Sequence, residues 1–249
     1  MTAPLRRPAT ADGLLLWIMH RFSEVFAQHA VLKGGMALRL LDCPRSTTDI
    51  DYVFVPFESK KDVAADVQRT LEELEGARVG IELHSKMLRA TVAVDGARVQ
   101  VEVDVARKCA SEPMATAALA TSLGQPSQVV RVLRASHALA HKLAAWNERR
   151  LHRDLFDLHF LRTRVGADVD VEVLSTRLGR IESRLPARRK VRSMTLPEFA
   201  WELRTAAESL DRAEIEAELA PLLPRAELAG LTPRLRAAMT GIAEQLGVR

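Results

Sequence analysis

Several residue types are scarce in this chain of 249 residues, and each scarcity limits either how the core is built or which class the protein belongs to. Aromatic residues account for only 4% of the sequence, so aliphatic side chains must form most of the core. The two cysteines, Cys43 and Cys109, give neither a disulfide framework nor the spacing of a zinc site. No apolar run approaches the roughly 18 residues of a membrane-spanning helix, and residues 11–30 are typical of an amphipathic helix, not of a signal peptide. We therefore expect a cytoplasmic protein with no membrane partner.

The net charge is a mild +4 at pH 7, but the cations fall in clusters. The clusters are Arg149, Arg150 and Arg153, then Arg162 and Arg164, then Arg188, Arg189, Lys190 and Arg192. Arginine binds phosphate through two parallel hydrogen bonds, so an RNA or DNA partner is one explanation. A coding bias that enriches arginine without any partner is the other, and the sequence leaves both open.

The most informative stretch runs from Leu32 to Asp51. Gly34 and Gly35 open an expected helix over residues 36–41, where the backbone can approach phosphate oxygens and the helix N-terminus offers free N–H groups. Asp49 and Asp51 begin an expected strand over residues 49–55, and residues two apart on a strand point to the same face. Carboxylate and phosphate oxygens are the ligands that Mg²⁺ prefers. The pattern predicts nucleotidyl transfer.

A third carboxylate is expected on a later strand. Residues 98–105 alternate between polar and apolar, and Asp95–Gly96 joins them to residues 87–94 as a two-residue hairpin turn. Glu102 and Asp104 lie on the same polar face of this strand. A strand with a solvated outer face explains the same pattern without any catalytic role.

The second half of the chain has helical periodicity. The Gly- and Pro-containing segment from Leu123 to Ser127 marks the expected boundary, and a helix is expected from Ser127 to Arg149. Further helices are expected over residues 151–164 and 171–184, and Thr195 with Glu198 forms a capping-box pattern. We therefore predict two domains, residues 1–124 and 125–249. The predicted fold class is α+β, a mixed sheet with helices followed by an all-helical domain.

The segment from Val31 to Val53 resembles the signature of the AbiEii/AbiGii-type nucleotidyltransferase toxins, a branch of the DNA polymerase beta-like nucleotidyltransferase superfamily. Members often carry a Leu-Lys-Gly-Gly-Thr-Ala-Leu run and an Arg-x-Ser/Thr-x-Asp-Ile-Asp run, which correspond here to residues 32–38 and 45–51. Met36 departs from this pattern, because the family usually has Thr or Ser there. Weakened or altered nucleotide handling is the expected result.

A second block of the chain also resembles this family, whose members carry a lysine followed by an Arg-Asp-x-x-Asp-Leu motif. Lys142 and the run from Arg153 to Leu158 match it. The resemblance implies that Lys142 neutralises charge on a triphosphate, and that Arg153 and Asp154 orient the lysine or the nucleotide. It also implies a nucleotidyltransferase core whose active site lies in a cleft completed by the helical domain.

The resemblance thus assigns a role to each candidate residue. Asp49, Asp51 and Asp104 would hold Mg²⁺ or Mn²⁺, with Glu102 as the alternative to Asp104. The expected catalytic residues are Asp49, Asp51, Asp104, Lys142 and Asp154. The expected nucleotide-binding residues are Lys33, Gly34, Gly35, Met36, Arg45, Thr47, Lys142 and Arg153.

The implied reaction transfers a nucleoside monophosphate from a nucleoside triphosphate to an acceptor hydroxyl, with the 3′ end of tRNA as the leading acceptor. The implied role is the toxin of a bacterial toxin–antitoxin or phage-defence system, with a cognate antitoxin protein as partner. Two alternatives remain at this stage. The enzyme could modify a protein or a small molecule such as an aminoglycoside, or a degenerate nucleotidyltransferase could act as a binding module.

Overall fold

The computed structural model describes residues 7–85 and 87–247, and the chain divides into two compact units, Met1–Arg134 and Ala135–Arg249. This division falls after strand β7 (Val129–Leu133), which belongs to the first unit and not to the helical part. A helix beginning at Ser127 was therefore wrong for residues 129–133. Three valines in this short segment suit a strand, and pairing with distant parts of the chain fixes it there.

The first unit is built on one mixed sheet of seven strands in the order β3-β4-β5-β2-β1-β7-β6. The strand β2 runs parallel to β5, and β1 runs parallel to β7, while the other neighbours are antiparallel. The remaining strands are β1 (Ala30–Lys33), β2 (Asp49–Phe54), β3 (Arg78–Leu83), β4 (Leu88–Val94), β5 (Ala97–Val105) and β6 (Ser111–Ala115). The expected hairpin is β4–β5, turning at Asp95 and Gly96.

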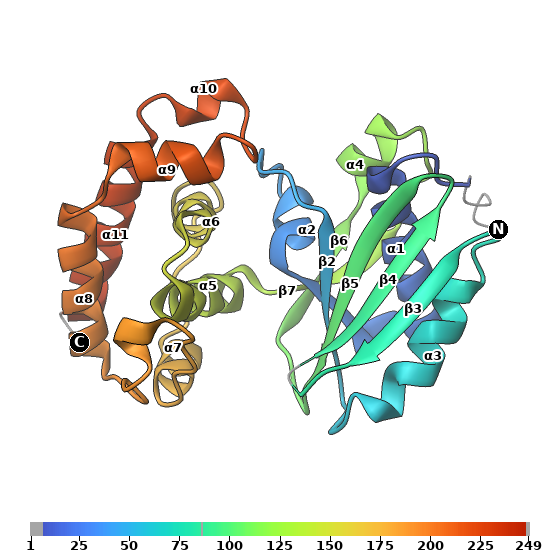
Figure 1. Cartoon of the computed structure of the whole chain (residues 1–249), viewed down its shortest axis with the longest axis horizontal. Coiled ribbons are helices and arrows are strands. Elements are labelled where there is room, and N and C mark those ends of the chain that lie inside the picture. Colours follow the sequence, from blue (N-terminus) through green and yellow to red (C-terminus); the bar gives the residue numbers. More distant parts are fainter. Residues whose placement is uncertain (1–6, 86, 248–249) are drawn as a thin grey trace. The chain divides into compact units, whose positions relative to one another are not determined.

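Helices α1 (Ala11–Phe26) and α3 (Lys61–Glu72) lie along one face of this sheet (Figure 1). Thr10 caps α1 by accepting a hydrogen bond from the Gly13 N–H, 3.1 Å away. The apolar residues of α1 share one buried core with the inward residues of β2, β4 and β5. The unit also contains α2 (Gly34–Arg39), α4 (Ala117–Ser122) and the 3₁₀ helix η1 (Ala27–His29). The opposite face of the sheet is therefore the one available for polar side chains.

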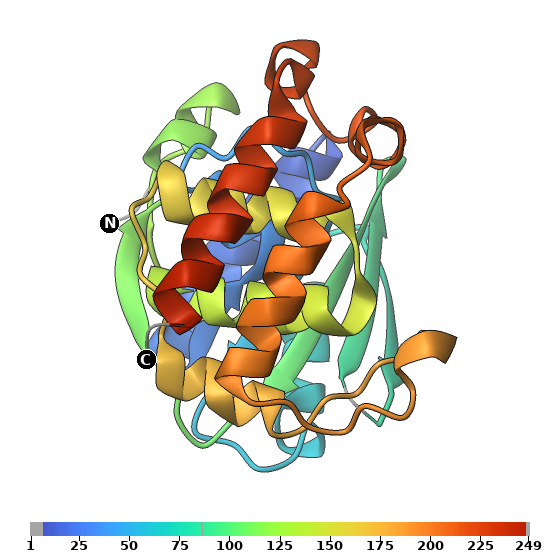
Figure 2. The ribbon, with the colours of Figure 1, turned by 90° about the vertical axis from the view of Figure 1, so that its left-hand side faces the viewer.

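In the described part of the second unit, all regular elements are helical. They are α5 (Ala135–Arg149), α6 (His152–Thr163), α7 (Val171–Leu178), η2 (Pro186–Arg188), α8 (Leu196–Glu208), α9 (Arg212–Leu219), α10 (Arg225–Leu228) and α11 (Leu231–Gly247). The capping box predicted at Thr195 and Glu198 begins α8, with both of its hydrogen bonds present. Helices α8 and α11 pack side by side (Figure 2).

The architecture confirms the predicted fold class, a mixed α+β sheet domain followed by helices. Among the described residues, no helix combines the length and the apolar character needed to cross a membrane.

Candidate functional site

Strand β2 presents two carboxylates on one face of the sheet. Asp49 is exposed and Asp51 is partly buried, while Ile50 and Tyr52 between and after them are 0% and 2% exposed in the core. The strand alternation thus sends the apolar residues inward and both carboxylates to the other face, as predicted. Burial also raises the pKa of Tyr52, so its hydroxyl stays neutral.

Gly34 lies directly against the carboxylate of Asp51. Strands β1 and β2 are antiparallel, with Lys33 opposite Asp51, so the turn into α2 passes over this carboxylate. A Cβ atom on Gly34 would overlap Oδ2 of Asp51 and lie 2.7 Å from its Cγ. Gly34 also has φ of +69°, which favours glycine. The glycine pair and the carboxylate strand therefore form one structural unit.

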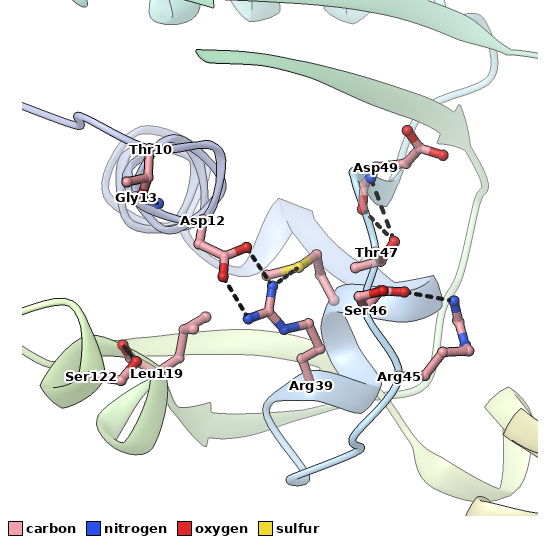
Figure 3. A network of polar contacts seen from close by, with 11 residues as sticks. Thr10, Asp12, Gly13, Arg39, Arg45, Ser46, Thr47, Asp49, Leu119 and Ser122 are labelled. Carbon is pink, nitrogen blue, oxygen red and sulfur yellow. Dashed lines mark hydrogen bonds and ion pairs between the residues drawn. The ribbon is translucent and has the colours of Figure 1, made fainter. Parts of the chain in front are cut away.

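Gly35 is covered by the loop that leads into β2. A Cβ atom there would lie 2.9 Å from Oγ1 of Thr47 and 3.1 Å from Nη2 of Arg45. Arg45 is only 8% exposed, and its Nη1 donates to the carbonyl of Ser46 at 3.2 Å (Figure 3). Thr47 is bonded to the backbone of Asp49, which fixes the start of the strand. The structure thus brings Gly34, Gly35, Arg45, Thr47 and Asp51 together.

Met36 does not face this loop. Its side chain is fully buried in the core of the first unit, and its sulfur lies 3.9 Å from Nη1 of Arg39. The Arg39 guanidinium is bound by the carboxylate of Asp12 at 2.7 and 3.0 Å (Figure 3), and its hydrogen bonds hold the pKa of Asp12 below the usual value. Position 36 is therefore a packing position, and the departure from the family pattern leaves its backbone N–H in place.

The strand β5 carries the two candidates for a third carboxylate. It runs parallel to β2, with Asp51 paired with Glu102 and Val53 paired with Asp104. Paired residues on neighbouring strands point to the same face, so both candidates share the face of Asp49 and Asp51. Glu102 is the neighbour of Asp51, and Asp104 is one step further along the strand.

The two candidates differ in their partners. Glu102 is partly buried and accepts hydrogen bonds from Arg89 at 2.9 Å and from Gln100 at 2.8 Å. Asp104 is exposed, and its Oδ1 accepts the backbone N–H of Val105 at 2.8 Å. Arg89 thus compensates the charge of Glu102, whereas Asp104 has no cationic partner among the described residues.

The donor set on β2 fits a hard divalent cation. Among residues 7–85 and 87–247, no group of three or more His, Cys, Asp or Glu side chains is arranged to hold a metal ion. Mg²⁺ commonly uses only one or two protein carboxylates and takes its other ligands from water and phosphate. Asp49 and Asp51 satisfy that requirement, and Asp51 lies directly against the glycine turn.

The second motif forms an ion-pair network between α5 and α6. Lys142 Nζ lies 2.6 Å from Oδ2 of Asp157 and 3.5 Å from Oδ1 of Asp154. Arg149 donates three hydrogen bonds to Asp154, at 2.7, 2.9 and 3.2 Å. Both carboxylates are buried, at 1% and 0% exposed, and buried charges require such partners. Arg153 is exposed, and its backbone N–H donates a hydrogen bond to the Glu218 carboxylate at 3.0 Å.

Asp157 was not among the predicted site residues, although it is the nearer partner of Lys142. Its spacing of three residues from Asp154 placed both on one helix face, which was the available signal. The partner of Lys142 on another helix could not be identified from spacing alone.

The fold is similar to that of two solved structures. MenT4, a nucleotidyltransferase toxin from Mycobacterium tuberculosis H37Rv, superposes with a TM-score of 0.63 at 17% identity, over 97% of this chain and 89% of that one. JHP933 from Helicobacter pylori superposes with a TM-score of 0.54 at 16% identity, over 95% of this chain and 91% of that one. At these identities the likeness establishes the fold alone.

The sequence matches one family model, described as the nucleotidyl transferase AbiEii toxin of a type IV toxin–antitoxin system, over residues 17–240. Comparison with curated proteins gives no match. The matched range includes the glycine pair, the β2 carboxylates and the Lys142 network.

Proposed function

Since this chain belongs to the AbiEii family of nucleotidyltransferase toxins of type IV toxin–antitoxin systems, we propose that it transfers a nucleoside monophosphate from a nucleoside triphosphate to an RNA hydroxyl. The proposed acceptor is the 3′ end of tRNA. The proposed cofactor is Mg²⁺ or Mn²⁺, and the proposed cellular setting is toxin–antitoxin control or phage defence. The family implies a cognate antitoxin as the biological partner.

The close approach of Gly34 to Asp51 is the observation that carries this proposal. The turn at Gly34, which has no side chain, lies directly beside the Asp51 carboxylate, a group of the kind that binds Mg²⁺. Phosphate oxygens can therefore contact backbone N–H groups and a carboxylate-bound cation at the same point. A purely structural glycine turn does not need a carboxylate packed against its Cα atom.

In the proposed reaction, Asp49 and Asp51 hold the divalent cation, which would neutralise charge on the phosphates. Gly34 and Gly35 admit the triphosphate to the backbone, and the buried Arg45 adds positive charge behind them. The acceptor oxygen forms a bond to the α-phosphorus while the bond to pyrophosphate breaks. Asp104 accepts the hydroxyl proton, because its charge is not already compensated by a cation within the described structure.

The helical unit contributes a further proposal that rests on the motif. Lys142 is proposed to bind the triphosphate as a point cation, with Arg153 and Asp154 as orienting residues. Asp157 holds its ammonium at 2.6 Å and limits its movement. A Lys142→Ala variant that keeps the wild-type KM for the nucleotide would contradict this role.

The acceptor is tested by incubating the protein with each α-labelled nucleoside triphosphate, Mg²⁺ and total tRNA, protein or aminoglycosides in parallel. Label in RNA that survives protease treatment is the expected result. Label in protein or in a small molecule would redirect the proposal to that acceptor class. Growth inhibition that persists in an Asp49→Ala, Asp51→Ala double variant would favour a binding module in place of an enzyme.

A further inference from the structure

The helical unit has an exposed tryptophan at the wall of a surface pocket. Trp201 on α8 is 68% exposed, although the other two tryptophans, Trp17 and Trp146, are 9% and 3% exposed in the cores of their units. A pocket of about 490 Å³ lies beside it, with apolar walls formed by Val191, Met194 and Trp201. An indole face left in solvent next to a pocket offers a stacking surface for a flat ring.

The segment before α8, which contributes Val191, Ser193 and Met194 to the pocket, is rich in positive charge. Residues 180–192 contain six cations, Arg180, Arg184, Arg188, Arg189, Lys190 and Arg192, against the single carboxylate of Glu182. Four of them, Arg184, Arg189, Lys190 and Arg192, are exposed and form no ion pair within the described part of the chain. Lys190 and Arg192 flank Val191, which lines the pocket itself. The loop is drawn in orange in Figure 2, beside the first turns of α8.

The charged side chains that line the pocket are both carboxylates. Glu198 lines it and is exposed, and hydrogen bonds from Thr195 hold the pKa of this carboxyl below its usual value. Glu202 also lines it, but Arg150 and Arg188 already compensate its charge. Both hydrogen bonds from Thr195 go to one oxygen of Glu198, Oε2, so the pocket keeps an anionic acceptor beside the neutral Ser193, while the segment before it is cationic.

This separation of charge distinguishes a nucleic acid from an acidic protein. A nucleotide combines a neutral ring that has amino donors with an anionic phosphate outside it. The ring can stack on Trp201 and donate to Glu198, while the phosphates meet Arg189, Lys190 and Arg192. A carboxylate side chain of an acidic peptide would instead meet Glu198 inside the pocket and be repelled.

We propose that Trp201 and the loop Arg189–Arg192 form a docking surface for single-stranded RNA, with one base stacked on the indole. The choice of RNA rests on the proposed function, in which RNA is the acceptor. The surface uses residues outside both signature motifs, so it would hold RNA without taking part in the chemistry.

The test measures binding of a fluorescein-labelled single-stranded RNA of about twelve nucleotides at several salt concentrations, without nucleoside triphosphate. Trp201→Ala should weaken binding about 5- to 150-fold without changing the salt dependence, and Trp201→Phe should restore most of the affinity. An Arg189→Gln, Lys190→Gln, Arg192→Gln triple variant should reduce the slope of log K against log salt by about 2. Arg225→Gln, an exposed arginine of α10, is the control and should change little.

Equal affinity and equal slope for all these variants would overturn the inference. If polyglutamate binds as tightly as the RNA, and the same variants lose that binding, the inference is overturned in favour of an acidic protein as the partner. The proposed function fails separately. Wild-type protein that transfers no label, while Trp201→Ala still weakens RNA binding, contradicts only the reaction. Label transfer to RNA by wild type, with unchanged RNA binding by Trp201→Ala, contradicts only the surface.

Discussion

At the scale of single residues, the site depends on two glycines, Gly34 and Gly35, that have no Cβ atom. Gly34 combines a positive φ with contact to the Asp51 carboxylate, so a side chain there meets two separate obstacles. Gly35 meets only the second kind of obstacle, since its φ is not positive and the side chains of Thr47 and Arg45 lie against an added Cβ. The ordinary helix glycine Gly241 has no atom within 4 Å of an added Cβ.

Gly34→Ala should therefore lower stability by about 1–2 kcal/mol from its backbone conformation alone, and by more from the overlap with Asp51. Gly241→Ala is the matched control and should raise stability by about 0.5–1 kcal/mol, because alanine favours the interior of α11. Urea unfolding of both variants measures this. Equal stability of Gly34→Ala and wild type would show that residue 34 is not held against the carboxylate.

His20 gives the second prediction at this scale. Its side chain is fully buried and bonded to Thr116 at 2.8 Å, and burial lowers its pKa from 6.5 to about 4. In the unfolded chain His20 therefore binds a proton below about pH 6.5, whereas in the folded protein it does so only below about pH 4. Stability should fall as the pH is lowered through this window, by up to about 1.4 kcal/mol for each pH unit.

His20→Gln keeps a polar group for Thr116 and removes this titration, so its unfolding free energy should depend less on pH between 6.5 and 4. His84→Gln removes an exposed imidazole from the same unit and serves as the control. Parallel pH dependence of wild type and His20→Gln would contradict the assignment.

At the scale of elements, the sequence predicted those whose signals are local. The Asp95–Gly96 turn, the alternation in β5 and the Thr195 capping box were confirmed in place. The strand β7 was missed because its position depends on pairing with β1 and β6, which lie far away in the chain. The edge strand β6 was missed as well, since Pro113 lies within it and argues locally against a strand.

The contact between α5 and α6 includes a buried ion pair, and this pair supplies the third prediction. Asp157→Asn leaves the Lys142 ammonium with a weaker partner and should destabilise the protein by about 3–5 kcal/mol. Glu216→Gln breaks an exposed pair with Arg212 and should cost less than about 1 kcal/mol. Thermal or urea unfolding compares the two variants. A small effect of Asp157→Asn would mean that the pair does not carry the contact between these helices.

At the scale of the whole molecule, the family motifs identified the glycine turn, the β2 carboxylates and Lys142 without any coordinates. They could not identify Asp157 as its nearer partner, or the fact that Met36 packs inward, because both depend on tertiary contacts. The exposure of Trp201 was equally invisible, since an aromatic residue in a helix is more often buried. The family establishes a nucleotidyltransferase toxin, and the residues that perform the transfer remain a proposal to be tested.

The most direct test compares transfer of label from α-labelled and γ-labelled nucleoside triphosphates into RNA by wild type, three single variants and one double variant. We predict that wild type transfers the α-label and not the γ-label. Asp49→Asn and Asp51→Asn should each reduce transfer by about a hundredfold or more. Asp66→Asn, which removes a carboxylate from α3, should not reduce it. Transfer of the γ-label, or undiminished α-label transfer by the Asp49→Asn, Asp51→Asn double variant, would contradict nucleotidyl transfer at this site.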